Sequence, residues 1–302
     1  MRVCAIDVGT NTVNSLVADV SPEGLAVLAD EERFARLGQG VDAAGRLAPD
    51  AMDRVVDRLA AAKATAEQYG AEQILIGATS ASRDASNVDE LQARVLRELE
   101  LEYRVISGAE EARLSFLGAL ALVPHVSRAV VFDVGGGSTE IVSGERGQLP
   151  GFVRSLDIGT VRLTERHGAV PPVSPERQSS VRQTVHEALA TIPPDVWARG
   201  PLVGTGSTAK VAAYVAGTDG AIPREPIQAA RARLASLTPE AITTLAPDVM
   251  AGRADVMVAA LILVEGLMEV AGADTFVSSA GGLRHGIALE AVNGSDEARP
   301  GV

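Results

Sequence analysis

The chain has 302 residues, a formal net charge of −12 and a single cysteine, Cys4. This length suggests two globular domains, and the acidic balance argues against nucleic acids and anionic membranes as partners. One cysteine cannot form a disulfide within the chain. No signal peptide or apolar run of membrane-spanning length is recognisable, so we expect a cytoplasmic protein that does not bind a membrane.

The first half of the chain alternates between predicted strands and helices. Apolar patterns predict strands over residues 3–6, 15–20, 25–36, 74–77 and 103–106, with helices over 51–69, 88–99 and 109–123. Pro124 ends the last of these helices because proline cannot continue a helical backbone. We therefore predict that residues 1–125 form one α/β lobe.

The second half starts this order again near residue 126. Strands are predicted over residues 129–133, 141–142, 152–156, 202–203 and 275–277, and an apolar core helix over 254–270. We expect a surface loop over residues 216–226 and a frayed tail from Asn293 to Val302. Residues 126–302 are therefore predicted to form a second α/β lobe.

Two glycine-containing turns join strands, one in each predicted lobe. The first is "DVGTNT" from Asp7 to Thr12 and the second is "DVGGGSTE" from Asp133 to Glu140. Such a turn exposes several backbone N–H groups, which suit an anion, and glycine lets a ligand approach closely. A single glycine-rich hairpin is more often a turn without a ligand, but the repetition favours two turns that grip one phosphate group across a cleft. The chain has no Gly-x-x-x-x-Gly-Lys-Ser/Thr sequence, which excludes a P-loop protein.

Several segments, in a fixed order along the chain, carry a family likeness. They include "DVGTNT" at Asp7, "SGAEEARL" at Ser107, "DVGGGSTE" at Asp133, "SLDIGTVRLTER" at Ser155, "VGTGSTA" at Val203 and "SSAGGLRHG" at Ser278. Together they resemble the exopolyphosphatase and guanosine pentaphosphate phosphohydrolase family of the actin, sugar kinase and chaperone ATPase superfamily. The resemblance implies the family's short form, an α/β protein with two ribonuclease-H-like (actin-like ATPase) lobes around a central phosphate-binding cleft, and a homodimer.

The resemblance also implies roles for individual residues. Glu111, in "SGAEEARL", corresponds to the general base, and Glu140 helps to orient the attacking water or a hydrated metal ion. The residues implied to bind phosphate are Gly9, Thr10, Asn11, Thr12, Arg83, Gly135, Gly136, Gly137, Ser138 and Thr139. Asp7 and Asp133 offer hard oxygen ligands to Mg²⁺, or alternatively Mn²⁺, held largely through water.

Each of these assignments has a simpler alternative. A pair of glutamates at a helix start is favoured by the helix dipole, and an aspartate before a turn commonly caps that turn. A lone surface arginine usually contributes little.

The expected reaction is hydrolysis of the terminal phosphates of inorganic polyphosphate. We expect direct attack by water, because no serine or cysteine nucleophile has a supporting motif. Guanosine pentaphosphate presents the same terminal anhydride and is the alternative substrate. Two further interpretations stay open: an ATP-dependent kinase of the same superfamily, with "VGTGST" at Val203 in a nucleotide pocket, and a catalytically silent sensor that binds alarmones.

Overall fold

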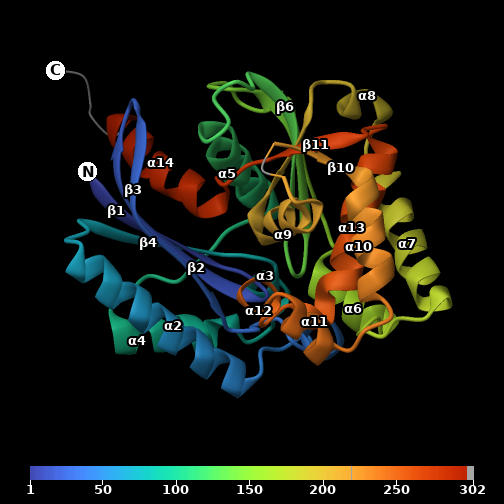
Figure 1. Cartoon of the computed structure of the whole chain (residues 1–302). Helices are drawn as coiled ribbons and strands as arrows, with labels where there is room; N and C mark the ends of the chain where they lie inside the picture. Colours follow the sequence, from blue (N-terminus) through green and yellow to red (C-terminus); the bar gives the residue numbers. More distant parts are fainter. Residues whose placement is uncertain (219, 298–302) are drawn as a thin grey trace. The chain divides into compact units, whose positions relative to one another are not determined.

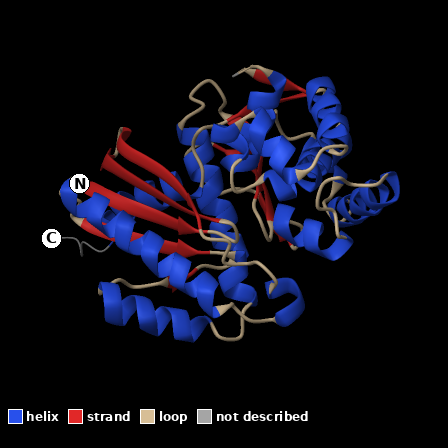
Figure 2. Ribbon diagram, turned by 60° about the horizontal axis from the view of Figure 1, so that its bottom comes forward, coloured by secondary structure: helices blue, strands red, loops and turns tan. Residues whose placement is uncertain are grey.

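The computed structural model describes residues 1–218 and 220–297. Its contacts divide the chain into two compact units. The first unit contains residues 1–122 and the segment from Gly281 onward, and the second contains residues 123–280. Figure 2 shows that each unit combines one sheet with helices packed against it.

The first unit is built on a five-stranded sheet with the order β3-β2-β1-β4-β5. Strands β1, β2 and β3 form an antiparallel meander, whereas β4 and β5 continue from β1 in parallel. The elements are β1 (Arg2–Val8), β2 (Thr12–Ser21), β3 (Gly24–Phe34), α1 (Val41–Ala44), α2 (Pro49–Gln68), β4 (Gln73–Ala78), α3 (Ser80–Asp84), α4 (Val88–Leu99), β5 (Arg104–Val105), α5 (Gly108–Ala121) and α14 (Leu283–Glu297).

The second unit has a six-stranded sheet with the order β10-β11-β9-β6-β7-β8. Its strands are β6 (Arg128–Val134), β7 (Thr139–Glu145), β8 (Phe152–Leu156), β9 (Leu202–Thr205), β10 (Ala221–Pro223) and β11 (Thr275–Ser278). Its helices are α6 (Thr160–His167), α7 (Pro175–Leu189), α8 (Pro194–Trp197), α9 (Gly206–Ala216), α10 (Arg224–Leu234), α11 (Pro239–Leu245), α12 (Pro247–Met250), the 3₁₀ turn η1 (Ala254–Val256) and α13 (Met257–Val270).

The two sheets share one topology. From β8, the second sheet runs β8-β7-β6-β9-β11, so the third, second, first and fourth strands of the unit follow one another as they do from β3 in the first sheet, and its sixth strand, β11, takes the place that the fifth strand has there. In both sheets the first three strands are antiparallel and the fourth is parallel to the first. This repeat confirms the predicted α/β class with ribonuclease-H-like units.

Strand β1 is buried on both faces. Its side chains point alternately to the two faces of the sheet, and helices cover both faces. Cys4 and Ile6 belong to the apolar cluster that contains Leu59 of α2, whereas Val3 and Ala5 belong to the cluster that contains α5 and α14 residues. Burial raises the pKa of the Cys4 thiol to about 12, and the negative charge of Glu31 adds to this shift. The single cysteine is therefore an inert core residue, as the sequence predicted.

The division of the chain differs from the predicted one at its end. All of residues 126–302 were predicted to form the second lobe, but α14 belongs to the first unit and packs on α5, β1 and β2. Figure 1 shows α14 beside α5. Glycines make this close crossing possible: a Cβ on Gly118 would lie 2.1 Å from the carbonyl oxygen of Gly282, and one on Gly286 would lie 2.0 Å from that of Leu114.

A bidentate ion pair also fixes α14 to the sheet of the first unit. Arg284 donates from Nε and Nη2 to the two carboxylate oxygens of Asp30 on β3, at 2.7 and 2.8 Å. Sequence periodicity could not show this assignment, because the contacts join residues more than 250 positions apart.

Two further predictions concern the ends of elements. The predicted tail from Asn293 is helical through Glu297, and residues 298–302 lie outside the described residues. The predicted loop over residues 216–226 contains the short strand β10 and residue 219, which is also outside them. Over residues 1–218 and 220–297, no helix has both the length and the apolar composition that crossing a membrane requires.

Candidate active site

The two predicted turns have the same backbone closure. In the first unit the N–H of Gly9 donates to the carbonyl of Thr12 at 2.8 Å, and in the second unit the N–H of Gly135 donates to the carbonyl of Ser138 at 3.0 Å. Both bonds close a four-residue connection between antiparallel strands. The repetition read from the sequence is therefore a repetition of structure.

The segment that follows β3 donates backbone hydrogen bonds to the carbonyls of the first turn. The carbonyl of Thr10 accepts the N–H of Gly38 at 2.8 Å. The carbonyl of Asn11 accepts two N–H groups, those of Ala35 and Arg36, at 3.0 and 2.9 Å. Gly38 lies close against this turn: a Cβ there would lie 2.1 Å from the Thr10 methyl group, so a larger residue would displace Thr10.

The glycine turn of the second unit is held in the same way by the first turn of α6. The carbonyl of Gly135 accepts the N–H of Thr160 at 2.9 Å, and that of Gly136 accepts two N–H groups, from Val161 at 2.8 Å and Arg162 at 3.1 Å. The carbonyl of Gly137 accepts Nε of Arg162 at 2.7 Å. Three consecutive peptide carbonyls of the turn therefore point at α6.

The orientation of these carbonyls sets the direction of the N–H groups. In a planar trans peptide the N–H points opposite to the carbonyl of the same peptide unit. The N–H groups of Gly136, Gly137 and Ser138 therefore project from the side of the turn that faces away from α6. Three neighbouring donors with one direction form the kind of concavity that binds an anion.

Gly159 allows α6 to approach the turn at backbone contact distance. A Cβ on Gly159 would lie 2.4 Å from the carbonyl carbon and oxygen of Gly136 and from the nitrogen of Gly137. No residue with a side chain fits there without displacing the helix. The glycine at this position is thus a requirement of the turn, although it lies more than 20 residues from it in sequence.

Glu111 lies in the first turn of α5 and is only 7% exposed. Ser107 caps this helix by accepting the N–H of Glu110 at 3.1 Å. Arg83 donates from Nη1 to Oε2 of Glu111 at 2.6 Å and to the carbonyl of Ile106 at 3.1 Å. Arg83 is therefore no isolated surface arginine: it fixes one oxygen of the predicted base.

The short helix that carries Arg83 is itself anchored. The hydroxyls of Ser82 and Tyr103 share a hydrogen bond of 2.8 Å, and Tyr103 is 3% exposed. Burial raises the pKa of Tyr103 well above its usual value, so its hydroxyl stays neutral at physiological pH. The anchor can therefore hold Arg83 without adding charge to the site.

The carboxylates at the two strand ends have corresponding places. Asp7 lies directly opposite Asn14, and Asp133 lies directly opposite Glu140, in the ladders of the two hairpins. Asn14 donates from Nδ2 to Asp7 at 3.0 Å. The pairing gives the first unit an amide beside its aspartate where the second unit has a second carboxylate.

The surroundings of Glu140 and Asp133 show how each is held. Glu140 is 1% exposed and accepts the Ser155 hydroxyl from β8 at 2.7 Å. Gly206, with φ of +78°, begins α9 beside Asp133, and a Cβ on it would lie 2.4 Å from Oδ1 of the carboxylate. Gly206, the second glycine of "VGTGST", thus brings the N-terminus of α9 to Asp133, and a helix N-terminus is a favourable place for a negative charge.

The described residues form no complete set of protein ligands for a metal ion. Among the described residues, no group of three or more His, Cys, Asp or Glu side chains is placed to hold one. Mg²⁺, however, commonly binds through one or two carboxylates, water and phosphate oxygens. Asp7 and Asp133 have the right donor chemistry for that mode of binding.

Three residues with a clear place in the site were not predicted from the sequence. They are Ser155, Gly159 and Arg162, all within "SLDIGTVRLTER". The segment was recognisable only as part of the family likeness. Its one local signal is a glycine directly before a helix, which by itself indicates a helix boundary rather than a contact with a distant turn.

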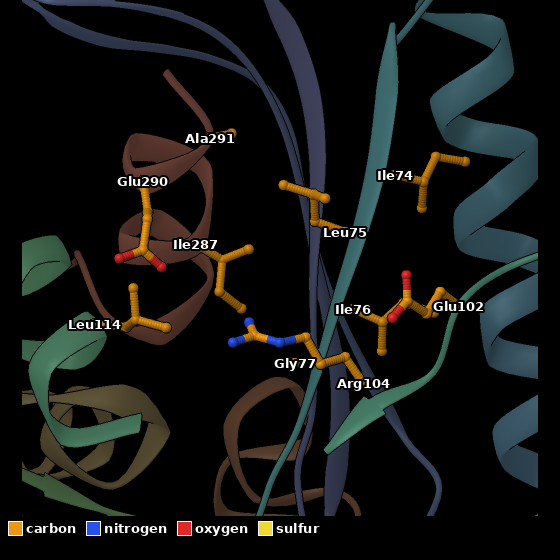
Figure 3. A pocket seen from close by; sticks show the side chains of 10 residues that line it. All are labelled: Ile74, Leu75, Ile76, Gly77, Glu102, Arg104, Leu114, Ile287, Glu290 and Ala291. Atoms are coloured by element: carbon orange, nitrogen blue, oxygen red, sulfur yellow. The ribbon is translucent and has the colours of Figure 1, made fainter. Parts of the chain in front are cut away.

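A small cavity of about 170 Å³ lies elsewhere in the first unit, beside β4 and α14 (Figure 3). Apolar side chains such as Ile76, Leu114 and Ile287 line most of it. Two of its charged residues form ion pairs, Arg104 with Glu110 and Glu290 with Arg113. None of the predicted site residues lines this cavity.

Known proteins share this architecture along nearly the whole chain. The model of the Ppx/GppA phosphatase family matches residues 16–294. Exopolyphosphatase 2 of Mycobacterium tuberculosis is 39% identical over 317 aligned positions, which cover 95% of this chain and 98% of that protein. The crystal structure of an exopolyphosphatase from Cytophaga hutchinsonii matches with a TM-score of 0.85 and 25% identity, covering 97% of this chain and 99% of that one. A Ppx/GppA family member from Aquifex aeolicus matches with a TM-score of 0.79 and 26% identity, covering 99% of each chain.

Proposed function

Because the chain belongs to the Ppx/GppA phosphatase family and is therefore a phosphatase, we propose that it is an exopolyphosphatase, which removes terminal phosphates from inorganic polyphosphate. The observation that carries the proposal is the glycine turn, whose carbonyls are bonded to α6 so that three N–H groups project together from its other side. These donors suit the oxygens of a phosphate group. The matching turn from Gly9 to Thr12 provides a second group of backbone and hydroxyl donors.

In the proposed reaction, water attacks the terminal phosphorus in line with the bond to be broken. Glu111 accepts the proton of the water, and the Arg83 ion pair keeps its carboxylate oriented. The bridging P–O bond breaks, and its electron pair leaves with the shortened chain, while the terminal group is released as inorganic phosphate. Glu140, held by Ser155, orients the water from the second unit.

Mg²⁺, or alternatively Mn²⁺, completes the proposal as the cofactor. Asp7 and Asp133 are the residues that would hold it, through water. When bound, the ion would neutralise part of the negative charge on the phosphate oxygens. The homodimer that the resemblance implied is part of the same proposal, and light scattering of the purified protein tests it by mass.

The experiment that tests the function is phosphate release with Mg²⁺ from polyphosphates of several lengths, guanosine pentaphosphate and ATP. Glu111→Gln should lower kcat on polyphosphate by roughly 10² to 10⁴, the usual contribution of a general base. Glu110→Gln is the matched control, because this neighbour pairs with Arg104 and has no role in the proposed reaction. Its kcat should stay close to that of the wild type.

The other substrates decide between the alternatives. Faster release from guanosine pentaphosphate than from any polyphosphate would make the nucleotide the substrate. Release from none of the three would contradict the proposal and favour a binding function. Equal losses in the two glutamine variants would remove Glu111 from its assigned role.

A further inference from the structure

The hydrogen bonds that orient the glycine turn are of two kinds. The carbonyls of Gly135 and Gly136 accept backbone N–H groups of α6, which any residue other than proline supplies. The carbonyl of Gly137 instead accepts a side-chain donor, Nε of Arg162, at 2.7 Å. The direction of the Gly137–Ser138 peptide therefore depends on which amino acid occupies position 162.

We propose that Arg162 is a positioning residue that directs the Ser138 N–H toward a bound phosphate group. The assignment rests on the proposed function, since it names the residue that completes the phosphate turn. Nε of Arg162 holds the Gly137 carbonyl, and the planar peptide then fixes the Ser138 N–H in the opposite direction. A donor on the carbonyl also polarises the peptide, which strengthens its N–H as a donor.

The position of Arg162 in the fold supports this role. It is the third residue of α6, and its own backbone N–H also bonds to the turn, at the Gly136 carbonyl, at 3.1 Å. Its side chain is half-buried, and only the short stem from Cα to Nε is needed for the bond to Gly137. The guanidinium thus contacts the turn through a donor whose place is fixed by the helix.

Two substitutions separate the hydrogen bond from the charge. Arg162→Gln keeps an N–H donor at the same number of bonds from Cα and removes the charge. Arg162→Met keeps the length of the stem and removes both. Arg166→Met, on the exposed part of the same helix, is the control for the loss of one positive charge.

The binding measurement uses tripolyphosphate and calorimetry, with each variant in the Glu111→Gln background so that no turnover occurs. Arg162→Met should weaken binding about tenfold, the effect of one charge-assisted hydrogen bond. Arg162→Gln and Arg166→Met should stay within about threefold of the parent. Without the Glu111 substitution, Arg162→Met should raise KM for tripolyphosphate more than it lowers kcat.

Amide spectra give a second readout that does not need activity. With ¹⁵N-labelled serine, the Ser138 amide resonance should shift in Arg162→Met and return in Arg162→Gln, and inorganic phosphate should shift it in the wild type. Melting curves check that the variants fold.

Each outcome tests either the positioning role of Arg162 or the proposed exopolyphosphatase function. Equal effects of the Gln and Met substitutions would mean that charge rather than the hydrogen bond matters, which overturns the positioning role. Unchanged binding and an unchanged Ser138 resonance in Arg162→Met would also overturn it, while an active wild type would leave the exopolyphosphatase proposal standing. If the wild type releases no phosphate from any substrate, the proposed function fails, and the Ser138 resonance still tests the role of Arg162.

Discussion

Replacing Gly159 with alanine should separate α6 from the glycine turn. The added Cβ would lie 2.4 Å from backbone atoms of Gly136 and Gly137, well inside van der Waals contact. Backbone atoms cannot move aside as the end of a flexible side chain can, so the first turn of α6 has to shift. The expected result is a turn whose peptides are no longer held in one orientation.

The magnitude follows from the hydrogen bonds that the shift weakens. Three backbone bonds join the first turn of α6 to the glycine turn, with donor to acceptor distances of 2.8 to 3.1 Å. Each contributes about 1 kcal/mol net, so their loss costs about 3 kcal/mol of unfolding free energy. For a domain of this size, that loss lowers Tm by roughly 6 to 12 °C.

Scanning calorimetry and steady-state kinetics measure the two consequences. Gly151→Ala in the same unit is the control, because the nearest atom to its added Cβ, Nη1 of Arg199, lies at an ordinary contact distance of 3.9 Å. The control should melt at the wild-type temperature or slightly above it. Gly159→Ala should melt lower and have a higher KM for tripolyphosphate. If both variants behave alike, close backbone contact with α6 does not set the geometry of the turn.

Three other changes test separate parts of the structure. Arg83→Met should lower kcat by about tenfold or more, because it removes the ion pair of the largely buried Glu111 carboxylate. Arg104→Met, the control, removes an exposed ion pair and should change kcat little. Phosphate release measures kcat for both variants. Burial raises the pKa of Cys4 to about 12, so a thiol reagent at pH 8 should label the protein only after unfolding, and rapid labelling of the native protein would contradict this environment. Gly118→Ala should lower Tm even though alanine is the better helix former, because its Cβ would meet a backbone carbonyl at 2.1 Å, and a higher Tm would show that α5 and α14 can separate at no cost.

Local patterns predicted those parts of the fold that depend on residues close together in sequence. The helix predicted over residues 88–99 has the bounds of α4, and the two hairpins with their glycine turns lie where the repeated Asp-x-Gly pattern put them. In each case the signal is an apolar period or a turn composition that a few neighbouring residues carry. Cys4 was likewise recognised as a buried residue of the first strand.

The remaining features depend on contacts that no local pattern contains. The glycines around α14 have a role only in the contact with α5, so the predicted place of this helix, in the second lobe, was wrong. In the site, Glu111 was identified by family likeness, but its pairing with Arg83 joins residues 28 positions apart. Arg162 was missed for the same physical reason, since its partner carbonyl lies 25 residues earlier.

The return of α14 to the first unit sets the order in which the two units are completed during synthesis. Residues 123–280 are a continuous insertion, so during synthesis the second unit has all of its strands and helices before the first has its last helix. Domains generally fold as units while the chain emerges, so the later-encoded unit is the first that can mature. Until α14 is made, apolar residues such as Leu16 and Leu114 lack the helix that covers them. A chaperone or a solubilising partner would thus matter most while the first unit still lacks α14.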